Sequence, residues 1–136
     1  MNIAEISVGM SAEMSRTITS EAIISFAEAT GDFNPVHVDE EAGRASLFGE
    51  RIAHGMLGAG LISAVLGMKL PGAGALYLSQ TLKFVKPVKI GDTVTATVEV
   101  VEVITAKKRV RLATTVRNQD GDTVIEGEAI AKVRGE

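Results

Sequence analysis

The most apolar stretch of the chain reads HGMLGAGLISAVLGMKL and spans residues 54–70. It carries apolar residues on every face of a helix, and Pro71 and Gly72 follow it directly, as is typical just past a helix end. The apolar run from Met56 to Met68 is too short to cross a bilayer, because spanning takes about 20 residues. We therefore predict a helix over residues 54–70 that lies buried inside a globular domain.

Four glycines lie within this helix, although each costs up to about 1 kcal/mol relative to Ala in a helix interior. They are Gly55, Gly58, Gly60 and Gly67. A glycine at such a position indicates close approach of another backbone or of a ligand. We expect tight packing of the helix against a sheet to explain three of the four.

The rest of the chain has the patterns of an antiparallel sheet and one further helix. Runs rich in Val, Thr and Leu predict strands downstream of Pro71, with turn residues between them. A weaker alternation predicts an early strand over residues 11–18. A helix follows it, with Thr19 or Ser20 as its N-cap and Gly31 at its end. The downstream strands are expected over residues 76–85, 94–104, 109–117 and 123–133.

This order of elements favours an α+β fold. A curved antiparallel sheet, with a four-stranded meander after the apolar helix, would wrap around that central helix. The layout resembles a hot-dog fold. With 136 residues and 14.3 kDa the chain has the size of one domain, so we expect residues 1–136 to form a single one.

Composition excludes several classes of function. A net charge of -3 and a pI near 5.4 argue against a nucleic-acid partner bound through phosphate neutralisation, and one Tyr with no Trp leaves little for base stacking. The absence of cysteine excludes disulfides, thiolate nucleophiles and Cys-based metal sites. The N-terminus lacks a cationic segment followed by an apolar one, so we expect no secretory signal, no membrane partner and a cytoplasmic protein.

One short loop gathers titratable residues that have no evident structural role. It reads GDFNPVHVD and spans residues 31–39. Asp32 and His37 are five residues apart, a spacing that separates them on a helix and sends them to opposite faces of a strand. Pro35 supplies a turn, and Asn34 can hold the bend by bonding to nearby backbone. A carboxylate and an imidazole brought together in this way can hold and polarise one water molecule.

The titratable residues also have plainer interpretations. Asp32 and Asn34 can cap backbone groups of an ordinary turn, with His37 half exposed. A calcium-binding loop is excluded, because the spacing of oxygen ligands ends at Asn34 and no bidentate Glu follows at the required position. His54 is a competing acid/base candidate, and its alternative is a neutral histidine packed or hydrogen-bonded beside the helix start.

Residues 26–37, FAEATGDFNPVH, resemble the signature of the hydratase 2 family, the MaoC-like (R)-specific enoyl-CoA hydratases. One departure is small: six residues after His37 the family usually has Ala or Ser, and here Gly43 stands instead. It bears on local helix stability rather than on Asp32 and His37. The similarity covers most of the chain, continuing through residues 51–57, 76–80, 84–88 and 91–94.

The resemblance implies a hot-dog protein that pairs into homodimers and adds water to trans-2-enoyl-CoA, giving (R)-3-hydroxyacyl-CoA. It assigns the shared acid/base work to Asp32 and His37, and the orientation of the loop to Asn34. The reaction needs no metal and no redox cofactor. Addition at C3 places negative charge on the thioester oxygen, and Gly55 at the helix start can offer its backbone N–H to that oxygen.

Other polar groups are weaker candidates. Ser63 has no histidine at a recognisable motif spacing, so we expect no nucleophile there, although it can line an acyl pocket. Gly58-x-Gly60 is no dinucleotide fingerprint, because Ser63 occupies the third glycine position. Clusters of basic residues can be ordinary solvated strand ends, or they can bind the phosphates of coenzyme A. Two sets compete for that role: Lys107, Lys108, Arg109 and Arg111, or Lys83, Lys86 and Lys89.

Two rival functions stay open beside the hydratase. A hot-dog thioesterase would direct the same water to the thioester carbonyl instead of C3. A noncatalytic acyl-binding module would keep only the fold, and the presence of Asp32, Asn34 and His37 counts against it. We also expect a homodimer, because Val- and Thr-rich sheet edges are usually covered.

Overall fold

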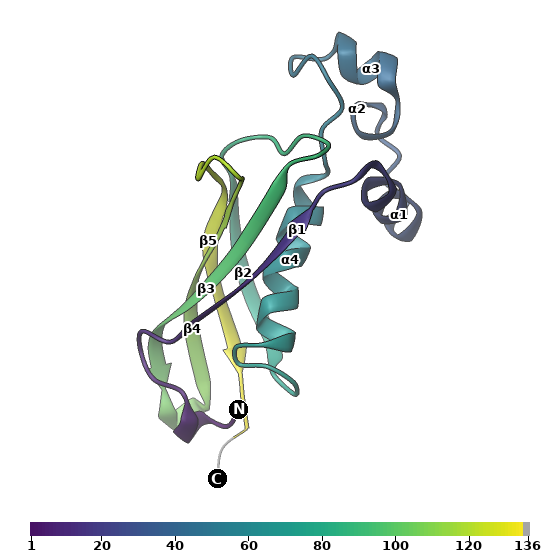
Figure 1. The fold of residues 1–136 in the computed structure, drawn as a ribbon. Helices are drawn as coiled ribbons and strands as arrows, with labels where there is room; N and C mark the ends of the chain where they lie inside the picture. Colours follow the sequence, from purple (N-terminus) through teal and green to yellow (C-terminus); the bar gives the residue numbers. More distant parts are fainter. Residues whose placement is uncertain (135–136) are drawn as a thin grey trace.

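The computed structural model describes residues 1–134 and contains one antiparallel sheet, one long helix and three shorter helices (Figure 1). All five predicted strands and both predicted helices are present, each within a few residues of its expected bounds. The strands are β1 (Ser11–Thr17), β2 (Leu76–Phe84), β3 (Thr93–Ile104), β4 (Arg109–Arg117) and β5 (Thr123–Lys132). The helices are α1 (Ser20–Thr30), α2 (Pro35–Val38), α3 (Glu40–Ala45) and α4 (Gly55–Met68), and 3-10 turns cover Ile3–Glu5 and Thr105–Lys107.

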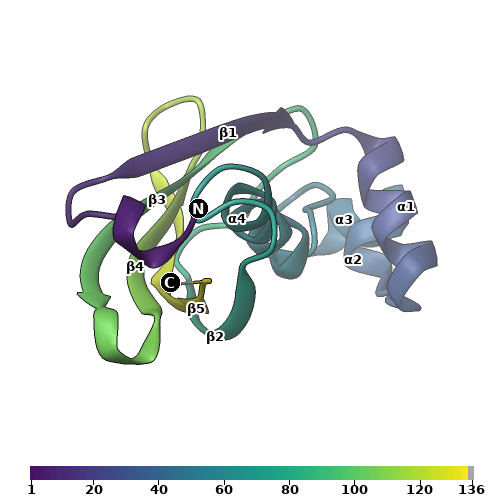
Figure 2. The same cartoon turned by 90° about the horizontal axis from the view of Figure 1, so that it is seen from below.

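The strand order in the sheet is β1-β3-β4-β5-β2, with every neighbouring pair antiparallel. The predicted four-stranded meander is wrong at one strand, because β2 pairs with β5 at the far edge instead of with β3. Figure 2 shows the sheet curving around α4 between its two edges. Alternation along a strand indicates which face is buried, but it does not indicate which strand lies beside it.

The helix α4 fills the concave side of the sheet. Ile62, Val65 and Leu66 of α4 are buried and pack into one apolar cluster with the sheet. Alternation along the strands directs Val98 of β3 and Val110 of β4 into the same cluster, where both are fully buried. A curved sheet around an apolar helix is the arrangement that the sequence predicts.

One face of α4 is exposed, contrary to the expectation of a helix buried on all sides. A Cβ at Gly60 or Gly67 would meet no atom within 4 Å, so tight packing explains two of the four glycines rather than three. At Gly58 a Cβ would lie 2.9 Å from Cδ1 of Ile125, and Gly55 is the other glycine of α4 with a close neighbour. Four of the exposed positions of α4 repeat at the spacing of one helical face: Met56, Gly60, Ser63 and Gly67.

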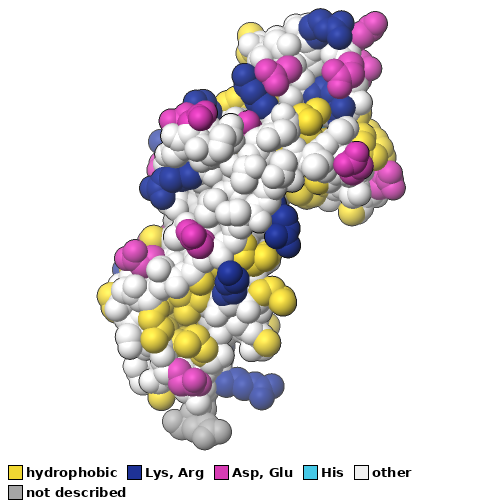
Figure 3. All heavy atoms as spheres, in the orientation of Figure 1, with side chains coloured by type: hydrophobic (Ala, Val, Ile, Leu, Met, Phe, Trp, Pro, Cys, Tyr) yellow, Lys and Arg dark blue, Asp and Glu magenta, His cyan; other side chains and the backbone are white. Residues whose placement is uncertain are grey.

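The helices α1, α2 and α3 lie beyond one end of the sheet, next to the start of α4 (Figure 1). Acidic and basic side chains are interspersed over this end on the face shown in Figure 3, without a patch of a single sign. In the part of the chain that the structure describes, no helix combines the length and the apolar character needed to span a membrane.

Candidate active site

The loop of titratable residues begins where α1 ends. Gly31 adopts a left-handed conformation with a φ of 83° and turns the chain away from the helix axis. Oδ1 of Asp32 accepts a hydrogen bond from the backbone N–H of Asn34 at 3.1 Å. Oδ1 of Asn34 in turn accepts from the N–H of Val36 at 3.4 Å and so caps α2, which begins at Pro35. The capping contacts of an ordinary turn are therefore present.

The segment before α4 fixes the ring of His37. Nδ1 of His37 lies 2.8 Å from the carbonyl oxygen of Ile52. Because a carbonyl oxygen only accepts hydrogen bonds, Nδ1 carries the proton, and the neutral ring keeps its lone pair at Nε2. Nε2 of His37 is thus the nitrogen that is able to accept a proton.

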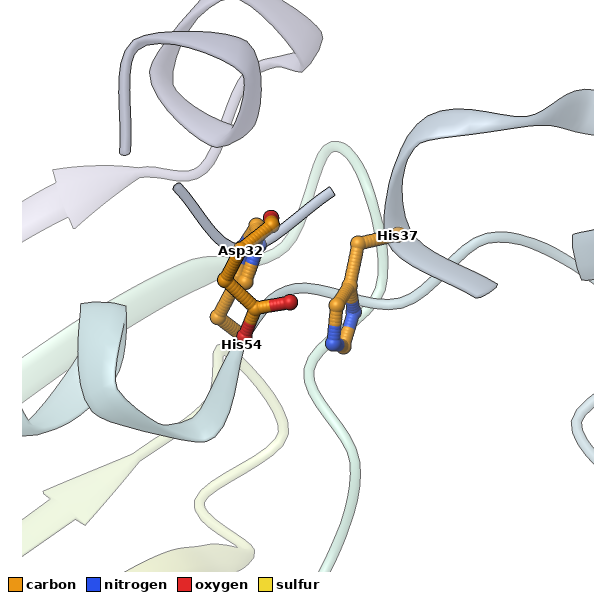
Figure 4. A group of neighbouring side chains, drawn as sticks. All are labelled: Asp32, His37 and His54. Carbon is orange, nitrogen blue, oxygen red and sulfur yellow. Dashed lines mark hydrogen bonds between the residues drawn. The ribbon is translucent and has the colours of Figure 1, made fainter. Parts of the chain in front are cut away.

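Asp32 and His37 converge, as the turn at Pro35 predicts. A carboxylate oxygen of Asp32 and a ring nitrogen of His37 lie no more than 4.8 Å apart. Figure 4 shows the carboxylate and the ring facing a common gap. Two hydrogen bonds of about 2.8 Å to one tetrahedral water span about 4.6 Å. A separation of no more than 4.8 Å is therefore compatible with one water molecule that contacts both side chains.

His54 lies at the N-cap of α4, behind this pair. It is only 3% exposed, and its Nε2–H donates to the carbonyl oxygen of Asp32 at 2.9 Å. Its ring centroid is 4.0 Å from that of His37 and 4.7 Å from that of Phe26. Nδ1 of His54 is buried without a hydrogen-bond partner among the described residues. This geometry agrees with the interpretation of His54 as a packed and hydrogen-bonded histidine at the helix start.

Gly55 is the first residue of α4, at the positive end of the helix dipole. No protein group in the described part of the chain accepts a hydrogen bond from its N–H. The ring of Phe84 lies against its Cα, because a Cβ at Gly55 would come within 2.6 Å of Cε1 of that ring. The sequence suggested the donor, but nothing in it indicated the aromatic ring beside the donor.

Two cavities meet at these residues. The larger, of about 530 Å³, is mostly apolar and extends along Phe84 and Val88. The other, of about 490 Å³, lies on the side of Asp32 and Phe26. An extended thioester can therefore reach the gap between Asp32 and His37 from two sides. The residues that border both cavities are His37, His54, Gly55 and Met56.

The described residues contain one group of three potential metal ligands, Asp32, His37 and His54. One ligand atom of each residue lies within 4.8 Å of those of the other two. Two of the four ring nitrogens are already bound to backbone carbonyls. The other two, Nε2 of His37 and Nδ1 of His54, have no hydrogen-bond partner among the described residues.

Arg51 is a buried residue that the sequence patterns did not single out. It is 8% exposed, and its Nε donates to the carbonyl oxygen of His37 at 2.7 Å. Its Nη1 donates to Oγ of Ser20 at 3.2 Å and to Oε1 of Glu40 at 3.1 Å, which ties α1, α2 and α3 together. Helix α3 forms across Gly43, and a Cβ there would lie 2.6 Å from the backbone nitrogen of Arg51. An arginine that follows an acidic residue has the pattern of a solvated charge, so no local signal indicated its burial.

Residues 3–122 match the family model of the MaoC like domain. The chain belongs to the MaoC-like family. Its hot-dog fold agrees with a solved member, the R-hydratase PhaJ1 of Pseudomonas aeruginosa in its unliganded form. That structure superposes with a TM-score of 0.94 at 46% identity, covering 99% of this chain and 86% of the other.

Two curated relatives are similar over nearly the whole of this MaoC-like chain. An (R)-specific enoyl-CoA hydratase of Rhodospirillum rubrum is 51% identical over 129 residues, which cover 95% of this chain and 89% of the relative. A 3-hydroxybutyryl-CoA dehydratase of Methylorubrum extorquens is 50% identical over 129 residues, which cover 95% of this chain and 82% of the relative.

Proposed function

We propose that this MaoC-like protein is an (R)-specific hydro-lyase that adds water to trans-2-enoyl-CoA and gives (R)-3-hydroxyacyl-CoA, and that also catalyses the reverse dehydration. The observation that carries the proposal is the spacing of Asp32 and His37 around a position for one water, where two cavities meet. Relatives named as (R)-specific enoyl-CoA hydratases, at 51% and 39% identity, support the choice of substrate.

Asp32 and His37 share the acid/base work in this proposal. The water oxygen attacks C3 of the enoyl group while the pair takes up one proton, for which Nε2 of His37 and the Asp32 carboxylate are the available acceptors. The pair then returns a proton to C2, so that H and OH have been added and both side chains regain their starting states. Asn34 keeps the loop in place by capping α2.

Gly55 stabilises the charge that develops during the attack. Addition at C3 moves negative charge onto the thioester oxygen, and a preorganised donor at that oxygen lowers the barrier. The N–H of Gly55 stands at the positive end of α4 with no protein acceptor among the described residues. The ring of Phe84 lies beside this donor and presents an apolar surface next to it.

An assay with crotonyl-CoA tests the proposed reaction. We expect the enone absorbance to fall without release of thiol, and the product to have the (R) configuration. EDTA should leave the rate unchanged, because the proposed chemistry uses no metal. Release of free coenzyme A in step with the absorbance change would favour the thioesterase, and no change of either signal would favour the noncatalytic module.

The basic residues that meet coenzyme A are proposed from their distance to the site. The run over residues 107–111 lies around the β3–β4 turn, at the opposite end of the sheet from α1–α3 (Figure 1). Lys86 lines the larger cavity and pairs with Asp122 at 2.6 Å, while Lys89 pairs with Glu50 at 3.2 Å. The set that contains Lys86 and Lys89 is therefore the one that can reach the phosphates of a bound thioester.

We further propose that the protein forms a homodimer through β2 and the exposed face of α4. Tyr77 of β2 and Ser63 of α4 border one small cavity of about 120 Å³, so the strand edge and the helix face are adjacent. A second copy that covered both would bury apolar surface and pair the open edge. The large apolar side chains exposed on β2 are Leu76, Tyr77, Leu78 and Phe84.

Each copy is proposed to be one domain over residues 1–136. Support comes from β1 and β5, which lie near the two ends of the chain and join the same sheet. Limited proteolysis should therefore leave no stable fragment that lacks either strand.

A further inference from the structure

His54 touches both residues of the proposed acid/base pair. Its Nε2–H donates to the backbone carbonyl of Asp32 at 2.9 Å, and its ring stacks on that of His37 at 4.0 Å with an interplanar angle of 31°. We propose that His54 is a positioning residue that fixes the backbone of Asp32 and the plane of the His37 ring. The inference rests on the proposed function, because it requires Asp32 and His37 to carry the reaction.

The hydrogen bond from His54 acts on a loop with few other anchors. Asp32 is exposed, and its N–H and its carboxylate bond only to near neighbours, Thr30 at 3.2 Å and Asn34 at 3.1 Å. Among the described residues, His54 is the one hydrogen-bond partner of Asp32 that is distant in sequence. A displacement of about 1 Å in a reacting group can cost about 100-fold in rate, so the loss of this anchor should be visible in catalysis.

The stacked ring acts on His37 in a second way. The bond from Nδ1 to Ile52 holds one edge of the His37 ring but leaves the ring free to tilt about that bond. The ring of His54 covers a face of His37, and Phe26 backs His54 at 4.7 Å. The three rings pack against one another at tilted angles of 31° and 47°, and this packing limits the tilt and keeps Nε2 of His37 directed at the water position.

His54 is not placed to exchange protons with the substrate. Its Nε2–H is bound to a carbonyl, and its Nδ1 is shielded from solvent and has no hydrogen-bond partner among the described residues. The geometry therefore assigns different roles to the two histidines of the stack.

Three substitutions separate the two contacts. His54→Gln keeps a donor near the position of Nε2 and removes the ring, His54→Phe keeps a ring and removes the donor, and His54→Ala removes both. We expect kcat for crotonyl-CoA to fall by about 100-fold in the Ala variant and by about tenfold in each of the others, with KM nearly unchanged. The higher rates of the Gln and Phe variants are the partial rescue that a positioning residue requires.

Thr114→Val is the matched control for lost stability. Thr114 is 1% exposed and accepts a hydrogen bond from Gln80 at 2.9 Å, and it borders neither cavity of the site. This variant should unfold at a lower temperature and keep the wild-type kcat per folded molecule. If His54→Ala keeps the wild-type kcat, or loses activity only in proportion to the unfolded fraction, His54 is merely structural and the proposal is wrong.

Nitrogen-15 NMR of the imidazoles gives a readout that does not depend on catalysis. The wild type should show His54 as the Nε2–H tautomer and His37 as the Nδ1–H tautomer, and the His37 signal should broaden in His54→Ala. A wild-type His54 in the Nδ1–H tautomer would overturn the inference even in an active enzyme. A wild type with these tautomers that does not hydrate crotonyl-CoA would instead refute the proposed function.

Discussion

Asp32 is both a turn residue and a proposed acid/base group, and Asp32→Asn separates the two roles. The variant keeps an oxygen that can accept from the N–H of Asn34 but loses the basicity of the carboxylate. We expect the hydration rate to fall by about 10²- to 10⁴-fold, while the free energy of unfolding changes by less than about 1 kcal/mol. Kinetics with crotonyl-CoA and thermal unfolding measure the two quantities, and a near-normal rate would leave Asp32 with the turn role alone.

His37→Ala and the double variant test whether Asp32 and His37 act on one water. The single variant should lose activity over the same range, about 10²- to 10⁴-fold. The double variant should lose far less than the product of the two single losses, because groups that act as a unit are not additive. Losses that multiply in the double variant would mean that the two residues act independently.

Gly55 permits a matched pair of substitutions at the proposed donor. Gly55→Ala and Gly55→Pro both add a Cβ that must displace the ring of Phe84, but only Pro also deletes the N–H. Proline is tolerated in a first helical turn, so both variants should fold. The Pro variant should be slower than the Ala variant by about 10²- to 10³-fold in kcat, as measured for the loss of one oxyanion donor. Equal rates for the two would exclude Gly55 as the donor.

At the scale of elements, the attachment of β2 to the sheet depends on Gly127 of β5. A Cβ at this position would lie 1.8 Å from the carbonyl oxygen of Thr81 in β2, so Gly127→Ala must push the two strands apart. We expect a loss of about 3 kcal/mol or more in the free energy of unfolding, measured by chemical denaturation. The control is Glu126→Ala, because Glu126 is an exposed neighbour on the same strand. This substitution should change the free energy of unfolding by less than about 0.5 kcal/mol. Similar stabilities for the two variants would contradict this packing.

The ion pair of Lys86 and Asp122 joins the segment after β2 to the turn before β5 and predicts a pH dependence. The hydrogen bond and charge of Lys86 lower the pKa of Asp122, and those of Asp122 raise the pKa of Lys86. Because the pKa of Asp122 is lower in the folded protein, the ion pair stabilises the fold at any pH above the ordinary carboxyl pKa of about 4. This stabilisation is lost as the pH falls through the lowered pKa of the folded protein. Because the pKa of Lys86 is raised in the folded protein, the stabilisation by the ion pair persists up to about pH 10 and is lost above that pH.

Asp122→Asn removes this pair, so its Tm should lie slightly below that of the wild type at neutral pH. Both partners are about half exposed, so the difference should be small and should shrink in high salt. Below about pH 4 the difference should shrink, and it should close as the pH falls through the lowered pKa of Asp122, because the wild-type carboxylate then becomes protonated as well. Thermal unfolding from pH 3 to pH 8 measures it, and a gap that stays constant down to pH 3 would exclude the ion pair as its cause.

At the scale of the whole molecule, the oligomeric state decides whether β2 is an open edge. Light scattering at micromolar concentration should give about twice the chain mass of 14.3 kDa. A double variant, Leu76→Lys with Leu78→Lys, should shift the protein to a monomer, because lysines on an edge strand oppose pairing. Val8→Lys adds a charge at another exposed apolar position and should remain dimeric. A monomeric wild type would refute the homodimer.

Features that depend on neighbours along the chain could be predicted from local patterns. Thr19 caps α1 by accepting from a backbone N–H three residues on, and Gly31 ends it in a left-handed conformation. The bend at Pro35, which brings Asp32 and His37 together, likewise depends on contacts within a few residues. The resemblance of residues 26–37 to a family signature added the expected reaction, because that signature lies within this one continuous segment.

Features that depend on contacts across the fold could not be predicted in this way. The partner of β2, the burial of Arg51 and the ring of Phe84 beside Gly55 join segments that are distant in sequence. The carbonyl of Ile52 that sets the tautomer of His37 is also supplied by another segment. Hydrophobic periodicity indicates only which face of a helix or strand is apolar, and capping residues indicate only where a helix begins or ends. Two distant segments meet when the free energy gained by burying their apolar side chains in a shared core exceeds the entropy lost in closing the loop between them. Both quantities depend on the folded chain and not on any local pattern.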